Sequence, residues 1–211
     1  MLQKAATLVV ICELIAFLAW LVYYRRLTET RYKLFTIYLG IISVTELLNL
    51  LFHGRFNSWI INVNVPLQFI FLMCFLLYGY GKTWNRILAG FIVIYLFFLT
   101  MERLDYFELP VNFNSMSYGV GNLLLIVAVI MALGRIFRQS GTLEYNRNCL
   151  FWIVMGIIIF YIGSFPYQNF RNIFWSKEEY FDTAYTLHYL SQAFNCIMYL
   201  LFAYSVKWKI K

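Results

Sequence analysis

Long apolar segments, separated by short polar or charged stretches, run through the whole sequence. A membrane-spanning helix needs about 20 mainly apolar residues, and seven segments come close to that length. They lie at about Ala5–Tyr24, Leu34–His53, Trp59–Tyr80, Ile87–Met101 with its flanks, Met116–Phe137, Cys149–Phe165 and Thr183–Val206. Each segment is continuous, whereas the strands of a membrane barrel alternate apolar and polar residues. The pattern therefore predicts an all-α, polytopic membrane bundle of seven transmembrane helices.

The composition agrees with a membrane protein and excludes several other classes. Of the 211 residues, 62% are hydrophobic and 13% are charged, whereas soluble domains have about 25% charged residues. Disordered chains need low hydrophobicity and high charge, and four scattered cysteines do not make a disulfide framework. Seven spans of about 20 residues leave about 70 residues for loops and ends. We therefore expect a single seven-helix transmembrane domain over residues 1–211, without a separate soluble domain.

The positions of the basic residues predict the orientation of the helices. Twelve of the 17 Lys and Arg residues lie at the C-terminal end or in the loops on that side of the membrane, and five lie on the other side. Because cytoplasmic loops carry an excess of Lys and Arg, the N-terminus is predicted outside and the C-terminus in the cytoplasm. Basic charge spread over short loops favours anionic membrane lipids as partners. Nucleic acid is not expected as a partner, since it needs a concentrated basic face.

Polar residues and prolines predict the connections between the helices. The loop Glu102–Ser115 is rich in acidic and Asn residues, so we expect it to be exposed. Pro166 is expected to end the sixth helix, and Gln168–Asp182 to form a loop with a short amphipathic turn. The basic pair Arg25 and Arg26 follows the first apolar segment, which favours a retained helix over a signal peptide.

Polar side chains inside the predicted spans are the candidates for function, because each is costly in lipid. In the second segment they follow one helical face at i, i+3 and i+7, as Glu46, Asn49 and His53. In the seventh segment they follow one face at i, i+4 and i+7, as His188, Gln192 and Asn195. We expect both stripes to face the interior of the bundle.

The predicted topology brings the polar groups of several helices to one depth, in the outer half of the bundle. We therefore predict a polar cavity that opens outward and is closed towards the cytoplasm by apolar and aromatic residues. The candidate ligand-binding residues are Glu13, Glu46, Asn49, Asn64, Gln68, Asn122, His188, Gln192 and Asn195. Gln168 falls at the same depth, and three tyrosines are further candidates for the lining, namely Tyr161, Tyr167 and Tyr189.

A structural role is the alternative for each of these residues. Asn, Gln and Ser side chains in spans commonly hydrogen-bond a neighbouring helix, at about 0.6 kcal/mol each. Glu13 and Glu46 are harder to explain in this way, because no Lys or Arg lies near them within the spans. We expect each carboxyl group to be protonated, to be hydrogen-bonded to an amide or to His188, or to face water.

The sequence lacks the motifs of enzymes and metal proteins. No HExxH, HxxxH or paired-cysteine pattern supports a metal site made of Glu13, Glu46, His53 and His188. The seventh segment has no Lys in mid-span for a retinal Schiff base, and no phosphate-binding Gly-rich loop or nucleophile motif is present. We therefore expect no enzyme activity, no metal and no cofactor.

Four segments carry a resemblance to known proteins, namely Cys12–Ala16, Thr45–Leu47, Tyr161–Pro166 and Asn195–Phe202. Together they resemble a group of short seven-helix membrane proteins of unknown function from Bacteroidota-type bacteria. Some members of this group lie beside genes for two-component signalling. The resemblance covers the whole chain. It implies a multi-pass protein of the bacterial cytoplasmic (inner) membrane and a link to signalling, and it carries over no catalytic residue.

These features favour a sensor or receptor-like module. A small ligand would occupy the outward cavity, and the basic cytoplasmic loops would contact a cytoplasmic or membrane signalling protein. Such a partner is needed because the chain has no room for an output domain. A small seven-helix transporter and a structural subunit of a larger membrane complex are the alternatives, and the oligomeric state stays open.

Overall fold

The computed structural model describes residues 2–51, 55–78, 80–104, 115–140, 145–174 and 178–209, which are almost entirely helical. The helices are α1 (Leu2–Val22), α2 (Thr30–Leu51), α3 (Arg55–Leu77), α4 (Lys82–Leu104), α5 (Ser115–Ser140), α6 (Cys149–Gly163), α7 (Phe165–Phe174) and α8 (Phe181–Ser205). Short 3-10 turns occupy Tyr24–Arg26, Tyr145–Arg147, Glu178–Tyr180 and Val206–Trp208.

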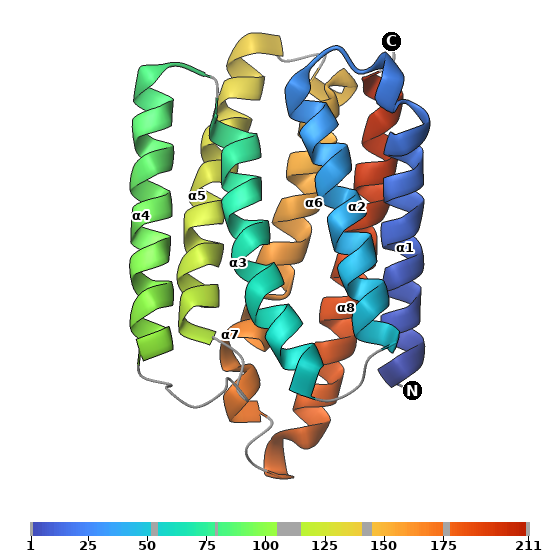
Figure 1. Ribbon diagram of the computed structural model, residues 1–211, viewed down its shortest axis with the longest axis vertical. Coiled ribbons are helices and arrows are strands. Elements are labelled where there is room, and N and C mark those ends of the chain that lie inside the picture. Colours follow the sequence, from blue (N-terminus) through green and yellow to red (C-terminus); the bar gives the residue numbers. More distant parts are fainter. Residues whose placement is uncertain are drawn as a thin grey trace.

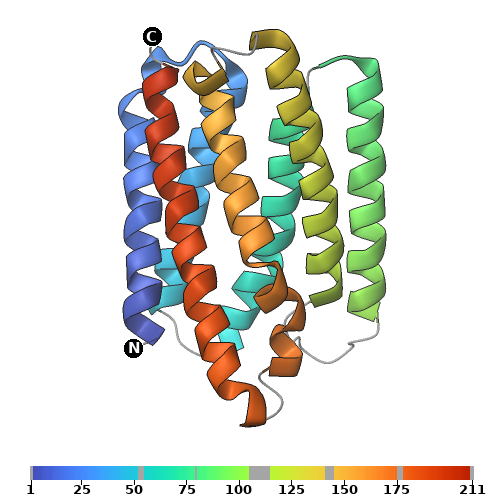
Figure 2. The same cartoon turned by 180° about the vertical axis from the view of Figure 1, so that it is seen from behind.

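The long helices pack side by side in one bundle (Figures 1 and 2). Helices α1, α3, α5 and α8 run in one direction, and α2, α4 and α6 run in the other. The two ends of the chain therefore lie at opposite ends of the bundle, here called the N-terminal end and the C-terminal end. Helix α8 packs along both α1 and α6. Helix α4 lies at the edge of the bundle, and the short α7 lies at the N-terminal end.

Within the part of the chain that the structure describes, four helices are long and apolar enough to cross a membrane. They hold the segments Ala5–Val22, Thr30–Leu51, Lys82–Leu104 and Met116–Arg138. Large apolar side chains also cover the outside of the bundle, as at Leu18, Val44, Val93 and Ile130. An extended apolar surface marks contact with lipid. The prediction of an all-α membrane protein is thus confirmed, while seven crossings and the orientation stay predictions.

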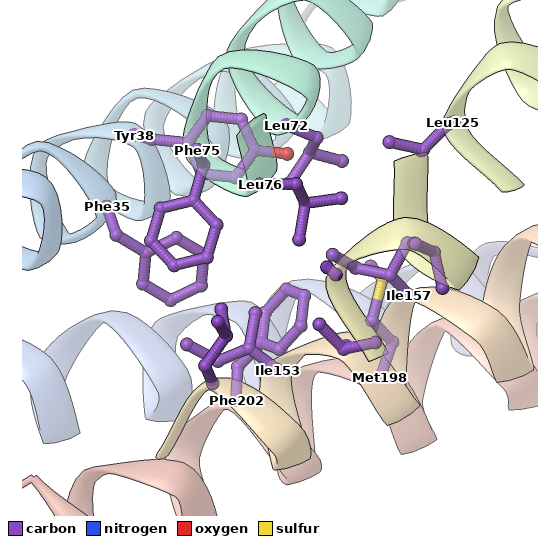
Figure 3. Close-up of a cluster of buried hydrophobic side chains, with 14 of the residues drawn as sticks. Phe35, Tyr38, Leu72, Phe75, Leu76, Leu125, Ile153, Ile157, Met198 and Phe202 are labelled. Carbon is purple, nitrogen blue, oxygen red and sulfur yellow. The ribbon is translucent and has the colours of Figure 1, made fainter. Parts of the chain in front are cut away.

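A cluster of aromatic and aliphatic side chains fills the bundle towards its C-terminal end (Figure 3). Phe35 of α2 stacks on Phe75 of α3 with ring centroids 4.9 Å apart, and it meets the edge of Phe202 of α8 at 5.3 Å. The indole N–H of Trp20 donates a hydrogen bond of 2.9 Å to the carbonyl oxygen of Phe202, which ties α1 to α8. Trp20, Phe35 and Phe202 are almost wholly buried. The core of this half around Phe35 is therefore apolar and closely packed.

The fourth predicted segment corresponds to a helix of the structure, and the end of the sixth differs from the prediction. The fourth segment, Ile87–Met101 with its flanks, is α4, which extends over Lys82–Leu104. Pro166 follows the end of α6 but lies in the first turn of α7, so much of the predicted loop Gln168–Asp182 is helix. Proline is favoured in a first turn because the N–H that it lacks has no helical partner there.

Glu102 also differs from the prediction, because its side chain is buried rather than exposed. It lies in the last turn of α4 and accepts hydrogen bonds from the backbone N–H groups of Met116 (3.0 Å) and Ser117 (2.8 Å) in the first turn of α5. Those N–H groups have no partner within their own helix. The rest of the predicted loop, from 105 to 114, lies outside the described residues.

Candidate functional site

A cavity of about 330 Å³ lies inside the bundle in the half towards the N-terminal end. Helices α1, α2 and α3 contribute four polar side chains, namely Glu13, Glu46, Asn49 and Gln68. Helices α7 and α8 contribute four more, namely Gln168, His188, Gln192 and Asn195. The cavity thus collects polar groups that are far apart in the sequence.

Seven of the nine candidate ligand-binding residues line this one cavity, and Gln168 joins them. The helical spacing explains why several polar side chains of α2 and of α8 line the cavity together. Positions three, four and seven residues apart lie on one face of a helix. Whether these residues bind a ligand stays a prediction. His53, the third member of the α2 stripe, lies outside the described residues.

Two of the nine candidates lie between helices instead of in the cavity lining. The side-chain amide of Asn64 donates to the hydroxyl oxygen of Thr45 at 3.0 Å and joins α3 to α2. The side-chain amide of Asn122 donates to the carbonyl oxygen of Tyr161 at 3.0 Å and joins α5 to α6. Both residues are buried. Their contacts fit the structural alternative, in which amides connect neighbouring helices.

The two acidic residues of the cavity lie close together. Glu13 is 2% exposed, and the Tyr199 hydroxyl is within hydrogen-bonding reach of its carboxyl group. The carboxyl group of Glu46 is within reach of the Asn49 side chain in the same way. The two carboxyl groups are near enough to interact electrostatically. The cavity therefore concentrates acidic groups at one place.

Three oxygen atoms around the cavity are buried without a hydrogen-bond partner among the described residues. They are Oε2 of Glu13, Oδ1 of Asn49 and Oδ1 of Asn195. A carboxylate oxygen and an amide oxygen are both acceptors. Leaving a buried acceptor without a donor costs about 1–3 kcal/mol. These atoms are suited to receive hydrogen bonds from a ligand.

Aromatic and aliphatic side chains complete the cavity wall. Phe69, Tyr118 and Tyr161 belong to the lining, and the ring centroid of Phe69 lies 5.2 Å from that of Tyr118 and 5.5 Å from that of Tyr161. Met198 and Tyr199 of α8 also belong to the lining. One helical turn further along α8, Phe202 belongs to the packed aromatic cluster. Successive turns of α8 thus first line the cavity and then join the packed aromatic cluster.

His188 has a defined neighbour at the cavity. Its ring Nδ1 lies 3.0 Å from the hydroxyl oxygen of Tyr167 in α7, and the two rings meet edge to face. Tyr167 is therefore near the site without being part of its lining, and Tyr189 is partly exposed. Of the three tyrosines considered from the sequence, Tyr161 alone is in the lining.

Sequence reasoning missed Tyr118 and Tyr199. Tyr199 continues the stripe of His188, Gln192 and Asn195 by four residues, so the helical period could have identified it. Tyr118 lies near the start of α5, and no stripe of polar residues at helical spacing includes it. Among the residues that the structure describes, no group of three or more His, Cys, Asp or Glu side chains could hold a metal ion.

Comparison of the chain with protein-family models, with curated proteins and with solved structures finds no match. The resemblance to short seven-helix proteins of Bacteroidota-type bacteria therefore stays an expectation from the sequence.

Proposed function

We propose that the protein is a receptor-like membrane sensor that binds a small ligand in its polar cavity. The observation that carries this proposal is the convergence of seven predicted residues on one cavity inside an apolar bundle. Polar groups are costly inside a membrane and commonly mark the path or the site of a ligand. The sensor would pass the binding event to a cytoplasmic or membrane signalling protein.

The proposal includes seven crossings, with the N-terminus outside and the C-terminus in the cytoplasm of a bacterial inner membrane. The alternating directions of α1, α2, α3, α4, α5, α6 and α8 support this count (Figure 1). The excess of Lys and Arg on the side of the C-terminus supports the orientation. In this orientation the cavity lies in the outer half, where a ligand from outside the cell can reach it.

A sensor explains the structure better than a transporter does. A transporter needs access to its site from both sides of the membrane. Beyond the cavity, towards the C-terminal end, the rings of Phe35, Phe75 and Phe202 pack on one another (Figure 3). A purely structural subunit gives no reason for three buried acceptor atoms around a cavity.

Ligand screening by thermal unfolding tests the proposal. The purified full chain in lipid nanodiscs would be mixed with a panel of small sugars, amino acids, amines and carboxylic acids. We expect at least one compound to raise Tm in a saturable manner, because a ligand that binds only the folded state stabilises it. Gln192→Leu and Asn195→Ala should lose the shift. Glu29→Gln is the matched control, because Glu29 pairs with Arg31 and Lys209 away from the cavity.

Two results would contradict the proposal. One is the absence of a Tm shift with the entire panel. The other is flux of a stabilising compound into proteoliposomes that contain this protein alone, because flux requires a transporter.

A further inference from the structure

Acidic side chains outnumber basic ones in the cavity lining. Glu13 and Glu46 both belong to it, its described residues include no Lys or Arg, and its one basic side chain, His188, has the Tyr167 hydroxyl 3.0 Å from Nδ1. Charges inside a membrane protein are normally paired, because an unpaired charge in a medium of low polarity is strongly disfavoured. A positively charged ligand would supply the counter-charge that the chain itself does not place in the cavity.

The buried lining atoms that have no hydrogen-bond partner among the described residues show the same preference. They are Glu13 Oε2, Asn49 Oδ1 and Asn195 Oδ1, and all three are acceptors. They come from three different helices, α1, α2 and α8. An ammonium group carries three N–H donors and no acceptor, so one such group has the donors that these oxygen atoms need.

The remaining walls suit an organic cation better than a bare ion. Val9, Val10 and Leu50 are aliphatic, and Phe69, Tyr118 and Tyr161 are aromatic. Apolar walls bury carbon atoms, and the faces of aromatic rings attract cations. A volume of about 330 Å³ is at the lower end of the range of about 300–1,000 Å³ for small-molecule sites. This is far more space than a single metal ion occupies.

We infer that the cavity binds a small organic cation with a primary ammonium group, held by Glu13 and Glu46 and by the amide oxygens of Asn49 and Asn195. This inference rests on the proposed function and names the ligand class of that same site. The carbon skeleton of the amine lies against the aliphatic and aromatic walls. An anion fits less well, because it would face both carboxyl groups, and His188 is the one basic side chain in the described lining.

Matched compounds on one carbon skeleton test the charge requirement. The first set is putrescine, 1,4-butanediol and succinate, which share four carbons and differ in their end groups. The second set is phenethylamine, 2-phenylethanol and 3-phenylpropionate. Each compound would be titrated into the full chain in nanodiscs, with Tm and isothermal titration calorimetry as measurements. We expect saturable binding of at least one amine, at least about tenfold tighter than binding of its alcohol and its acid.

Variants then test the residues. Glu13→Gln and Glu46→Gln keep the shape of the side chain but remove its charge. Each should weaken amine binding by about tenfold or more, whereas Glu29→Gln should leave it unchanged. The Tm of each ligand-free variant shows whether the fold is retained. The comparison of the six compounds on the unchanged protein does not depend on the variants at all.

The outcomes separate this inference from the proposed function. Binding of an alcohol or an acid in preference to its amine, lost in Asn195→Ala, overturns the cation inference and leaves the receptor proposal standing. Failure of both amines overturns the inference, and the wider panel then decides the receptor proposal. Amine binding that is unchanged in both Glu13→Gln and Glu46→Gln also overturns it.

Discussion

The guanidinium group of Arg103 donates a hydrogen bond of 3.0 Å from Nη2 to the backbone carbonyl oxygen of Asn62. In a regular helix this carbonyl would receive the N–H of residue 66. Residue 66 is Pro66, which has no N–H. Arg103 of α4 thus supplies the donor that α3 lacks and ties the two helices together.

This contact predicts a non-additive pair of substitutions. Arg103→Met should lower stability by about 1 kcal/mol, because the Asn62 carbonyl group then lacks a donor. In a Pro66→Ala background the helix regains its own N–H at position 66, so the same substitution should cost clearly less. Tm values of the wild type, both single variants and the double variant, measured in one detergent, check the prediction. Equal losses in both backgrounds would contradict it.

Removal of the Glu102 carboxylate should lower stability, because this group accepts hydrogen bonds from the first turn of α5. Glu102→Ala removes the acceptor for the N–H groups of Met116 and Ser117. Loss of such a cap costs about 0.5–2 kcal/mol, and a lower Tm measures it. Glu102→Gln keeps one oxygen acceptor and should lose less. Glu178→Gln is a suitable control, because Glu178 is exposed. The prediction fails if Glu102→Ala unfolds at the wild-type temperature.

Substitution of alanine for glycine should have opposite effects on stability at two positions, Gly156 and Gly134. A Cβ atom at Gly156 of α6 would lie 3.1 Å from the carbonyl oxygen of Met198 in α8, so Gly156→Ala must push the two backbones apart. We expect a cost of about 1–3 kcal/mol. At Gly134 of α5 no heavy atom lies within 4 Å of the added Cβ. Gly134→Ala should therefore stabilise the helix, by about 0.5–1 kcal/mol. Two Tm shifts of the same sign would contradict this.

The orientation predicts where reporter proteins are active. A green fluorescent protein fused after Lys211 should fluoresce, because the C-terminus is predicted in the cytoplasm. Alkaline phosphatase, which needs the oxidising periplasm to form its disulfides, should be inactive at the same position. Fusions after Tyr80 are expected to behave like those after Lys211, since both positions are predicted on the cytoplasmic side. An active phosphatase fusion after Lys211 would exclude the proposed orientation.

The sequence predicted the polar stripes because they follow from helical geometry alone. Glu46 and Asn49, and likewise His188, Gln192 and Asn195, share a face whatever surrounds their helix, and all five line the cavity. Asn64 and Asn122 could not be placed in the same way. Their hydrogen bonds go to Thr45 and Tyr161, and which helix lies opposite depends on packing.

Helix ends were harder to predict from the sequence. Proline is typical both of the residues after a helix and of the first turn of the next one, and Pro166 holds both positions at once. An acidic residue after an apolar segment usually indicates a solvated loop. Glu102 is buried because the first turn of α5 packs against it. The residues around Glu102 in the sequence do not predict this contact.

The length of α6 has a consequence for how this part of the chain crosses the membrane. A helix of 15 residues is about 22 Å long, whereas the hydrocarbon layer is about 30 Å thick. In the proposed orientation α6 reaches the cytoplasmic face and ends below the outer headgroups, where Ser164 and α7 begin. A segment of this length does not cross the hydrocarbon layer by itself. In the proposed orientation the remaining depth on the outer side is left to α7, which carries Gln168 of the cavity lining.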